Sequence, residues 1–316
     1  MKQLYIAMYH YTRDLPNSRY PAIHGLDYDL FKQQINFFAN EMNVVTMEDV
    51  LNAENGGALP EKAVLLTFDD GYIDNYTFAL PVLKAHHMQG SFFIPGKTFT
   101  ENVLLDVNKI HFVLASTGDQ KLERQLLARM DHYRGREYSF PSNTELLEEY
   151  EKPSRYDTKE TVFIKRMLQT VLPEKLRNII ASELFAEFVG IPEDKFAREL
   201  YMNRDQIRMM KDSGMYIGLH GYDHYWLGHL SAEQMHEDLA KALDVMGEFL
   251  DPHAWVMNYP YGDRSPEVIS YIKSQGACLG LTTEVRVADL DKDSAFEIPR
   301  LDCNDFPPKS DNWGNM

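Results

Sequence analysis

The segment Ala63–Phe68 is a short apolar run that ends at two adjacent carboxylates, Asp69 and Asp70. An apolar run of this length, closed by polar residues and then by Gly71, is typical of a buried strand in a parallel sheet. Neighbouring carboxylates repel each other, so a fold that keeps them together must compensate their charge, for example with a cation. The segment therefore predicts a buried strand whose end presents one carboxylate to a metal ion and the other to a reaction as a base.

Three further apolar runs also end at residues able to do chemistry. They are Leu4–Tyr9 before His10, Met215–Leu219 before His220, and Ala254–Met257 before Asn258–Tyr261. Segments with helical spacing lie between the runs, at Leu30–Glu41, Phe78–His87, Ser231–Phe249 (opened by a capping box) and Pro266–Gln275. This alternation favours parallel strands with right-handed crossovers. Since sites in such folds lie at the carboxyl ends of the strands, we expect these polar residues at one edge.

Residues 98–204 interrupt this alternation. They are rich in Leu, Glu, Lys and Arg and predict amphipathic helices, the clearest being Lys121–Met130, Thr161–Val171 and Glu174–Val189. We interpret the segment as an inserted helical subdomain, which serves either as a packing or oligomer contact or as a lid that shapes the substrate site. The last residues, 306–316, contain Pro, Asn and Gly and are expected to form a loose C-terminal tail.

The composition narrows the classes of partner. The chain has 316 residues and a formal charge of −16, which argues against nucleic acid or an anionic membrane and suits a neutral or cationic substrate. Its two cysteines, Cys278 and Cys303, do not suggest a disulfide framework. No apolar run is long enough to cross a bilayer, and the N-terminus lacks the features of a signal peptide, so we expect a cytoplasmic protein.

The motif His220-Gly221-Tyr222-Asp223-His224 places two histidines four residues apart. A helical turn, or a tight loop after a strand, brings two imidazoles with this spacing to one face. Two histidines and one carboxylate are a common site for a divalent metal ion that keeps open positions for water. The preceding strand and the carboxylates at the end of another strand favour such a site.

Together these motifs resemble the NodB-homology polysaccharide deacetylases, carbohydrate esterase family 4. The first family motif, Thr-Phe-Asp-Asp, is matched by Thr67–Asp70. The second, His-[Ser/Thr]-x-x-His, is matched by His220 and His224, with Gly221 at the hydroxyl position. The third, Arg-x-Pro-Tyr, is matched in part by Asn258–Tyr261.

The resemblance covers residues 1–97 and 205–305. It implies an α/β fold, a distorted TIM-like (β/α)7 barrel, with residues 98–204 as a helical insertion. It also implies a chemistry for each motif residue.

By this resemblance, Asp70, His220 and His224 bind a divalent metal ion, usually Zn²⁺. Asp69 is then the general base. The backbone N–H at the Tyr261 position helps to hold the tetrahedral oxyanion.

The third motif departs from the family, because the arginine that orients the catalytic aspartate there is Asn258 here. Arg300, in the segment Glu297–Asp302, comes from another predicted strand end and is our candidate to replace it. The alternative is that Arg300 is only a surface or structural cation.

The general acid also departs from the usual order. The family takes it from an apolar strand ending Leu-x-His near the C-terminus, whereas here the N-terminal segment Leu4–His10 has that form. This order resembles the circularly permuted branch that includes poly-N-acetylglucosamine deacetylases, and a barrel permits it because first and last strands are neighbours. We therefore predict His10 as the general acid, the alternative being a structural histidine.

The resemblance implies a metal-dependent hydrolase that removes acetyl from an N-acetylated sugar or glycan. An O-acetyl esterase or another amidase would use the same groups. A non-catalytic glycan-binding relative is a third alternative, disfavoured because both aspartates and both histidines are present. Tyr9, Tyr72 and Tyr222 flank the motifs and are expected to line the site, and Trp226 is expected to form either a sugar subsite or part of the core.

Overall fold

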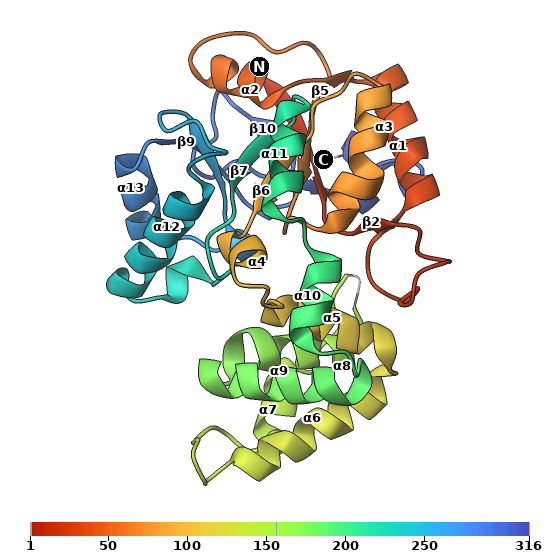
Figure 1. Cartoon of the computed structure of the whole chain (residues 1–316), viewed down its shortest axis with the longest axis vertical. Helices are drawn as coiled ribbons and strands as arrows, with labels where there is room; N and C mark the ends of the chain where they lie inside the picture. Colours follow the sequence, from red (N-terminus) through yellow and green to blue (C-terminus); the bar gives the residue numbers. More distant parts are fainter. Residues whose placement is uncertain (1, 156, 316) are drawn as a thin grey trace. The chain divides into compact units, whose positions relative to one another are not determined.

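The computed structural model describes residues 2–155 and 157–315 (Figure 1). These residues form two compact units. The first contains residues 2–14, 25–103 and 197–315, and the second contains residues 15–24 and 104–196.

A curled, mostly parallel sheet lies at the centre of the first unit. Its strands follow the order β10-β1-β5-β6-β7-β8-β9, with β4 beside β5 and β11 beside β1. Their bounds are β1 Gln3–Tyr9, β4 Asn43–Val44, β5 Ala63–Phe68, β6 Ser91–Ile94, β7 Tyr216–Leu219, β8 Trp255–Asn258, β9 Ala277–Leu281, β10 Ala288–Asp289 and β11 Leu301–Asp302. Short strands β2 Thr12–Arg13 and β3 Leu26–Asp27 pair separately. This architecture confirms the predicted distorted (β/α) barrel.

The N-terminal strand β1 pairs directly with β5, the strand that ends before Asp69 and Asp70. The strands are parallel and in register from Leu4 opposite Ala63 to Tyr9 opposite Phe68. The Asp69 N–H continues the ladder by donating to the Tyr9 carbonyl at 2.9 Å. The residue after each strand therefore lies at the same edge of the sheet.

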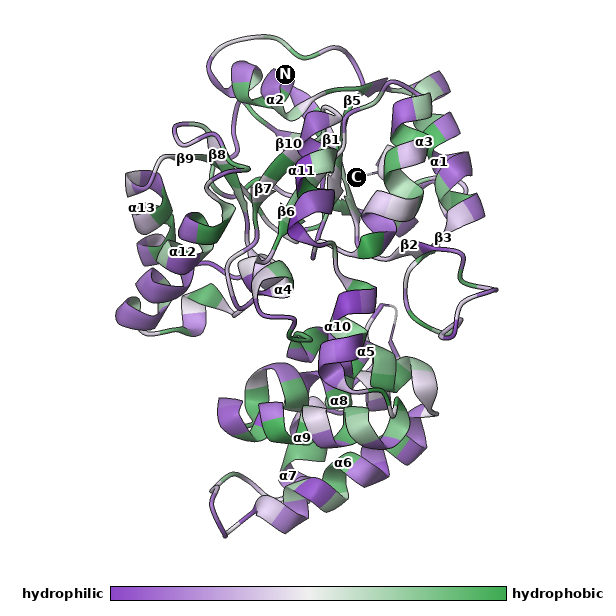
Figure 2. Ribbon diagram, viewed as in Figure 1, coloured by the Kyte–Doolittle hydropathy of each residue, from purple (hydrophilic) through white to green (hydrophobic). Residues whose placement is uncertain are grey.

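Helices pack around this sheet and form two apolar clusters with it. Their bounds are α1 Tyr28–Glu41, α2 Met47–Glu54, α3 Leu80–Ala85, α4 Gly96–Thr100, α11 Arg204–Asp212, α12 Ala232–Met246 and α13 Pro266–Ser274. Side chains of α1, α3, α11, α12 and α13 pack on one set of strand residues, while alternate strand residues pack on one another and on α2. Figure 2 accordingly shows green strands and helices with purple outer faces.

Local sequence signals explain where several helices begin and end. Ser231 and Gln234 form the predicted capping box at the start of α12. Ser265 caps α13, which starts at Pro266. The predicted helix at Phe78–His87 is shorter than expected, since a π-helical turn at Asn75–Ala79 precedes α3.

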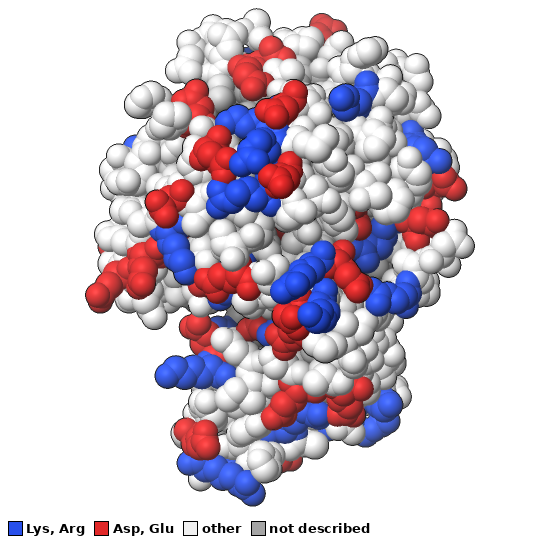
Figure 3. Space-filling model, viewed as in Figure 1, with Lys and Arg blue, Asp and Glu red and all other residues white. Residues whose placement is uncertain are grey.

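The described charges are mixed and the described helices are not membrane spans. On the face drawn in Figure 3, Lys and Arg side chains lie among Asp and Glu side chains rather than in a separate patch. Arg204 and Arg208 of α11, for instance, both pair with Glu248.

Among the described residues, no helix combines the length and the apolar character that crossing a bilayer requires.

The second unit is a bundle of helices. They are α5 Asp106–Ser116, α6 Asp119–Tyr133, α7 Asn143–Tyr150, α8 Lys159–Arg166 and α9 Glu174–Phe188, while α10 Glu193–Leu200 contains residues of both units. The predicted helices fall within α6, α8 with the π-helical turn Met167–Val171, and α9. Its core is apolar, with Leu126 and Phe163 fully buried. That this unit is an insertion between 98 and 204 stays a prediction.

The C-terminal segment differs from the expected loose tail. Phe306 is fully buried, with its ring centroid 5.1 Å from that of Phe38. Trp313 packs edge-on against Tyr5 and Phe37, each with ring centroids 5.6 Å apart. The expectation was wrong because it relied on the polar and glycine residues of the segment and overlooked Phe306 and Trp313, whose aromatic rings pack within the first unit.

We expect Phe306→Ala to lower the free energy of unfolding by about 3–5 kcal/mol, because it leaves a cavity in a fully buried site. Urea denaturation followed by circular dichroism measures the change. Asp311→Ala, at an exposed position in the same segment, is the matched control and should stay within about 0.5 kcal/mol. Equal stability of the two variants would contradict a packed segment.

Candidate metal and hydrolase site

The chain turns sharply where β5 ends, and this turn separates the two carboxylates. Asp70 and Gly71 both have left-handed backbone conformations, with φ of 71° and 67°. A left-handed non-glycine residue is uncommon and often marks a functional site. Asp69 and Asp70 are each 2% exposed, and each has its own set of partners.

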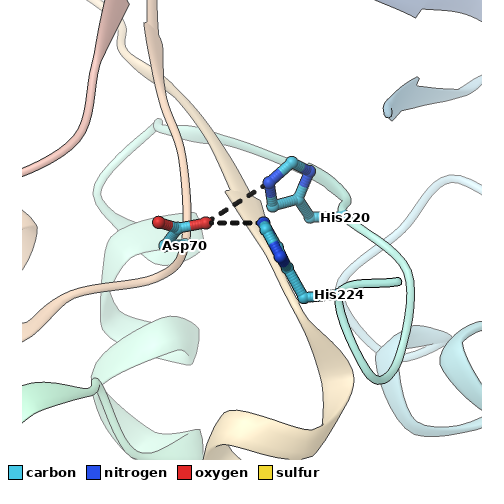
Figure 4. Close-up of side chains that lie close together, drawn as sticks. All are labelled: Asp70, His220 and His224. Carbon is cyan, nitrogen blue, oxygen red and sulfur yellow. Dashed lines mark ion pairs between the residues drawn. The ribbon is translucent and has the colours of Figure 1, made fainter. Parts of the chain in front are cut away.

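Asp70 meets the two histidines of the second motif. Its Oδ1 lies 3.3 Å from the Nε2 atom of His220 and 3.3 Å from that of His224 (Figure 4). One ligand atom from each residue lies within 4.8 Å of the others, and all three residues are buried.

The donor set fits a divalent cation. His220 Nδ1 lies 2.6 Å from the Asn258 carbonyl oxygen. A carbonyl only accepts, so Nδ1 bears a proton, and in the neutral tautomer the lone pair of Nε2 faces Asp70. Asp70 Oδ1 is buried and accepts no other hydrogen bond among the described residues. Burial lowers the pKa of His224, which favours the neutral form that binds metals.

The second oxygen of Asp70 has a partner that the sequence did not reveal. The buried Tyr72 hydroxyl donates to Asp70 Oδ2. Burial and the nearby Asp70 charge raise the pKa of Tyr72 well above its ordinary value, so its proton stays in place. Tyr72 was expected only to line the site; its position two residues after Asp70, on the same turn, was the available signal.

Asp69 is held by an arginine and an amide. Arg300 donates from Nη1 to Oδ1 and from Nη2 to Oδ2, each at 2.9 Å. Asn258 Nδ2 donates to Oδ1 at 2.7 Å. The structure thus brings the candidate Arg300 to Asp69. It also shows a contact from Asn258, which the sequence analysis treated only as the position where the motif arginine is absent.

Arg300 is itself fixed and excluded from solvent. It is 1% exposed, and its Nε donates to the Thr282 carbonyl at 2.8 Å. Burial raises the pKa of Asp69. The charges of Arg300 and His10 and the hydrogen bonds from Arg300 together lower it by more than burial raises it, so the pKa of Asp69 lies below its ordinary value. Asp69 is therefore a carboxylate at neutral pH.

His10 lies beside Asp69 at the edge of the sheet. Its Nε2 is 3.7 Å from Asp69 Oδ2, and its side chain is 40% exposed. The parallel pairing of β1 and β5 produces this approach. Tyr9, by contrast, points to the opposite face, where it is fully buried and donates to Gln34, so the expectation that it lines the site is wrong.

Tyr261 lies against His224. It follows β8 with a left-handed φ of 58°, and its ring centroid is 4.7 Å from that of His224. Trp226 stacks on Tyr261, with ring centroids 4.4 Å apart and planes within 7°. The structure therefore brings all seven candidate residues to one edge, and the role of each stays a prediction.

Comparisons with known proteins agree with this geometry. The model of the polysaccharide deacetylase family matches residues 56–133 and 155–279, which extends beyond the quoted motifs into the second unit. A putative polysaccharide deacetylase of Bacillus subtilis (strain 168), YxkH, is 58% identical over 38 residues, which is 12% of this chain and 14% of that protein.

Two solved structures have a similar fold. The Streptococcus pyogenes deacetylase PplD, in complex with acetate, has a TM-score of 0.57 at 17% identity, covering 99% of this chain and 97% of that one. IcaB from Ammonifex degensii has a TM-score of 0.57 at 20% identity, covering 100% and 98%. These structures show the shared fold, whereas the family model matches well over half of the sequence. The chain therefore belongs to the polysaccharide deacetylase family.

Proposed function

We propose that this chain is a metal-dependent deacetylase that hydrolyses the N-acetyl group of a glycan, giving acetate and a free amine. The observation that carries the proposal is the division of labour between two adjacent buried carboxylates. Asp70 faces two imidazole nitrogens at 3.3 Å, while Asp69 is locked by Arg300 and Asn258.

Asp70, His220 and His224 would hold the ion, and two imidazoles with one carboxylate suit Zn²⁺. When bound, the ion would polarise the acetyl carbonyl and lower the pKa of a water molecule towards about 7. Tyr72 keeps Asp70 oriented by donating to the oxygen that does not face the histidines.

Asp69 is the base in this proposal. Its lowered pKa keeps it ionised, and its two donors prevent it from rotating away from the attacking water. His10, beside Asp69 and partly exposed, would then donate a proton to the departing amine nitrogen. The Tyr261 backbone N–H would donate to the oxyanion that forms on the acetyl carbon.

The substrate class rests on the family and on chemistry. The Streptococcus pyogenes neighbour was solved with acetate, which is the acid that the proposed reaction releases. The net charge of −16 favours a neutral glycan and its cationic amine product over an anionic polymer. An N-acetylated sugar or glycan is therefore the substrate that we propose.

The purified chain loaded with Zn²⁺ should release acetate from N-acetylglucosamine oligomers, and a chelator should abolish this activity until metal is returned. His224→Ala should lose both bound metal and activity, because one of three ligands is gone. His229→Ala is the control, since that side chain is 69% exposed.

O-acetylated sugars are assayed in parallel. Acetate release from esters alone would reassign the chain as an O-acetyl esterase. Metal binding without either activity would identify a non-catalytic relative.

We expect His10→Ala to lower kcat on the N-acetyl substrate by about 10²–10⁴-fold, because an amine must be protonated to leave. The loss should be much smaller on an aryl acetate, whose phenolate leaves without a proton. His253→Ala, at an exposed position, is the control. An equal loss on both substrates would argue that His10 is only structural.

Arg300→Lys keeps the positive charge but loses the planar fork. We expect kcat to fall about tenfold to a hundredfold, because Asp69 is no longer held in one orientation. Arg286→Lys is the control, since Arg286 pairs with Glu284 and Asp293 instead of Asp69. Full activity of Arg300→Lys would contradict an orienting role.

Arg300→Met removes the cation that lowers the pKa of Asp69. A higher pKa means that Asp69 ionises only at higher pH, so the acid limb of the kcat/KM profile should move to higher pH. The same change should also lower the free energy of unfolding by about 3–5 kcal/mol, because it leaves a buried charge without its partner.

A further inference from the structure

The residues between the two histidines form an irregular loop. Gly221–Asp223 belong to neither a helix nor a strand, and Gly221 and Tyr222 are buried. Buried backbone groups must find hydrogen-bond partners. Whatever supplies these partners also fixes where the two imidazoles point.

One side of the loop is held by α4. The backbone N–H groups of Gly96 and Lys97 donate to the carbonyls of Gly221 and Tyr222, at 3.0 and 3.1 Å. The Lys97 ammonium also pairs with the Asp223 carboxylate. These contacts satisfy the carbonyls but leave the N–H groups of the loop to another element.

The other side of the loop is held by one side chain of α12. The Tyr222 N–H donates to Asp238 Oδ2 and the Asp223 N–H donates to Asp238 Oδ1, both at 2.9 Å. Asp238 is 6% exposed and lies in the middle of α12, so it neither caps its own helix nor belongs to a solvated face. Each carboxylate oxygen thus serves one backbone donor of the loop.

Gly221 explains why a carboxylate from outside is needed. It stands where the related motif has a hydroxyl residue, it has a φ of +70°, and it brings no side chain of its own. A Cβ at this position would lie 3.2 Å from Asp238 Oδ2. The Asp238 carboxylate therefore occupies the space next to the missing side chain.

We propose that Asp238 is a positioning residue for the metal site, whose carboxylate holds the 220–224 loop so that both histidine Nε2 atoms face Asp70. The proposal rests on the proposed function in one respect: the metal ion that Asp238 helps to position is the ion proposed to act in deacetylation. Loss of a group that orients a metal ligand commonly lowers metal affinity or activity by about 10- to 100-fold. Burial raises the pKa of Asp238 to about 6, so the fold keeps an unfavourably buried charge here.

The test is Asp238→Asn in the full chain. The amide keeps the size but replaces one acceptor oxygen with an NH₂ group that faces an N–H donor. We expect Zn²⁺ affinity, measured by competition with a chromogenic chelator, to fall about 10- to 100-fold. The visible spectrum of the Co²⁺ form should change, and at saturating metal kcat should fall while KM stays the same. Glu237→Gln, its exposed neighbour on α12, should match the unchanged chain in all three.

A folded Asp238→Asn variant with unchanged affinity and spectrum would overturn the proposal. If that variant does not fold, Gly221→Ala replaces it, because its Cβ would push against the carboxylate. Gly214→Ala is the matched control, because it has a φ of +87° and an added Cβ would meet no described residue within 4 Å apart from its chain neighbours. Affinity that falls in Gly221→Ala but not in Gly214→Ala supports the proposal, and equal affinity overturns it.

Affinity and spectrum also separate this proposal from the proposed function. A wild-type chain that binds metal but releases no acetate would end the deacetylase proposal, while the affinity comparison would still decide the role of Asp238. If the wild-type chain releases acetate and Asp238→Asn has unchanged metal affinity, the deacetylase proposal stands and the proposed role of Asp238 falls.

Discussion

Two neighbouring carboxylates buried at the end of β5 are the constraint on which the rest of the site depends. Asp69 and Asp70 are each 2% exposed, and their charges would repel strongly in a medium of low dielectric constant. The left-handed turn at Asp70 and Gly71 gives each carboxylate different surroundings. Asp69 is neutralised by a bidentate guanidinium. Asp70 instead faces two imidazoles, and its Oδ1 accepts no other hydrogen bond from the described part of the chain. Only Asp70 thus has surroundings that favour an added cation.

The partners of this pair come from distant parts of the chain, and the sheet accounts for their convergence. His10 follows β1, His220 follows β7 and Asn258 ends β8, while Arg300 precedes β11. Parallel strands end at the same edge, so His10, His220 and Asn258 meet there. Arg300 reaches this edge from the start of β11, because β11 pairs with the last part of β1, with Leu301 opposite Ala7. The direct pairing of β1 with β5 places His10, which follows the N-terminal strand, beside Asp69.

The sequence predicted the features that depend on local pattern. Apolar runs ending at polar residues indicated the strands, and the capping signal at Ser231 indicated α12. The features it missed depend on side chains that meet only in three dimensions. Asp238 lay in the predicted helix Ser231–Phe249 with nothing to single it out, and Tyr72 was noted only as a neighbour of a motif. Phe306 lay in a segment whose polar composition indicated a tail, although it is fully buried.

Asn258 and Arg300 show why a missing motif residue does not by itself remove a chemical group. A carboxylate at the barrel edge is within reach of several strand ends, so a guanidinium arriving from the segment before β11 contacts Asp69 as well as one arriving from β8 would. Asparagine is short enough to donate to Asp69 Oδ1 at 2.7 Å while leaving room for Arg300 to bind both oxygens. An arginine at position 258 would add a second buried guanidinium beside the first. The two cations would repel each other, because Asp69 already pairs with Arg300 and Asp70 faces the two histidines. The asparagine of the third motif and the arginine before β11 therefore hold Asp69 together in this structure.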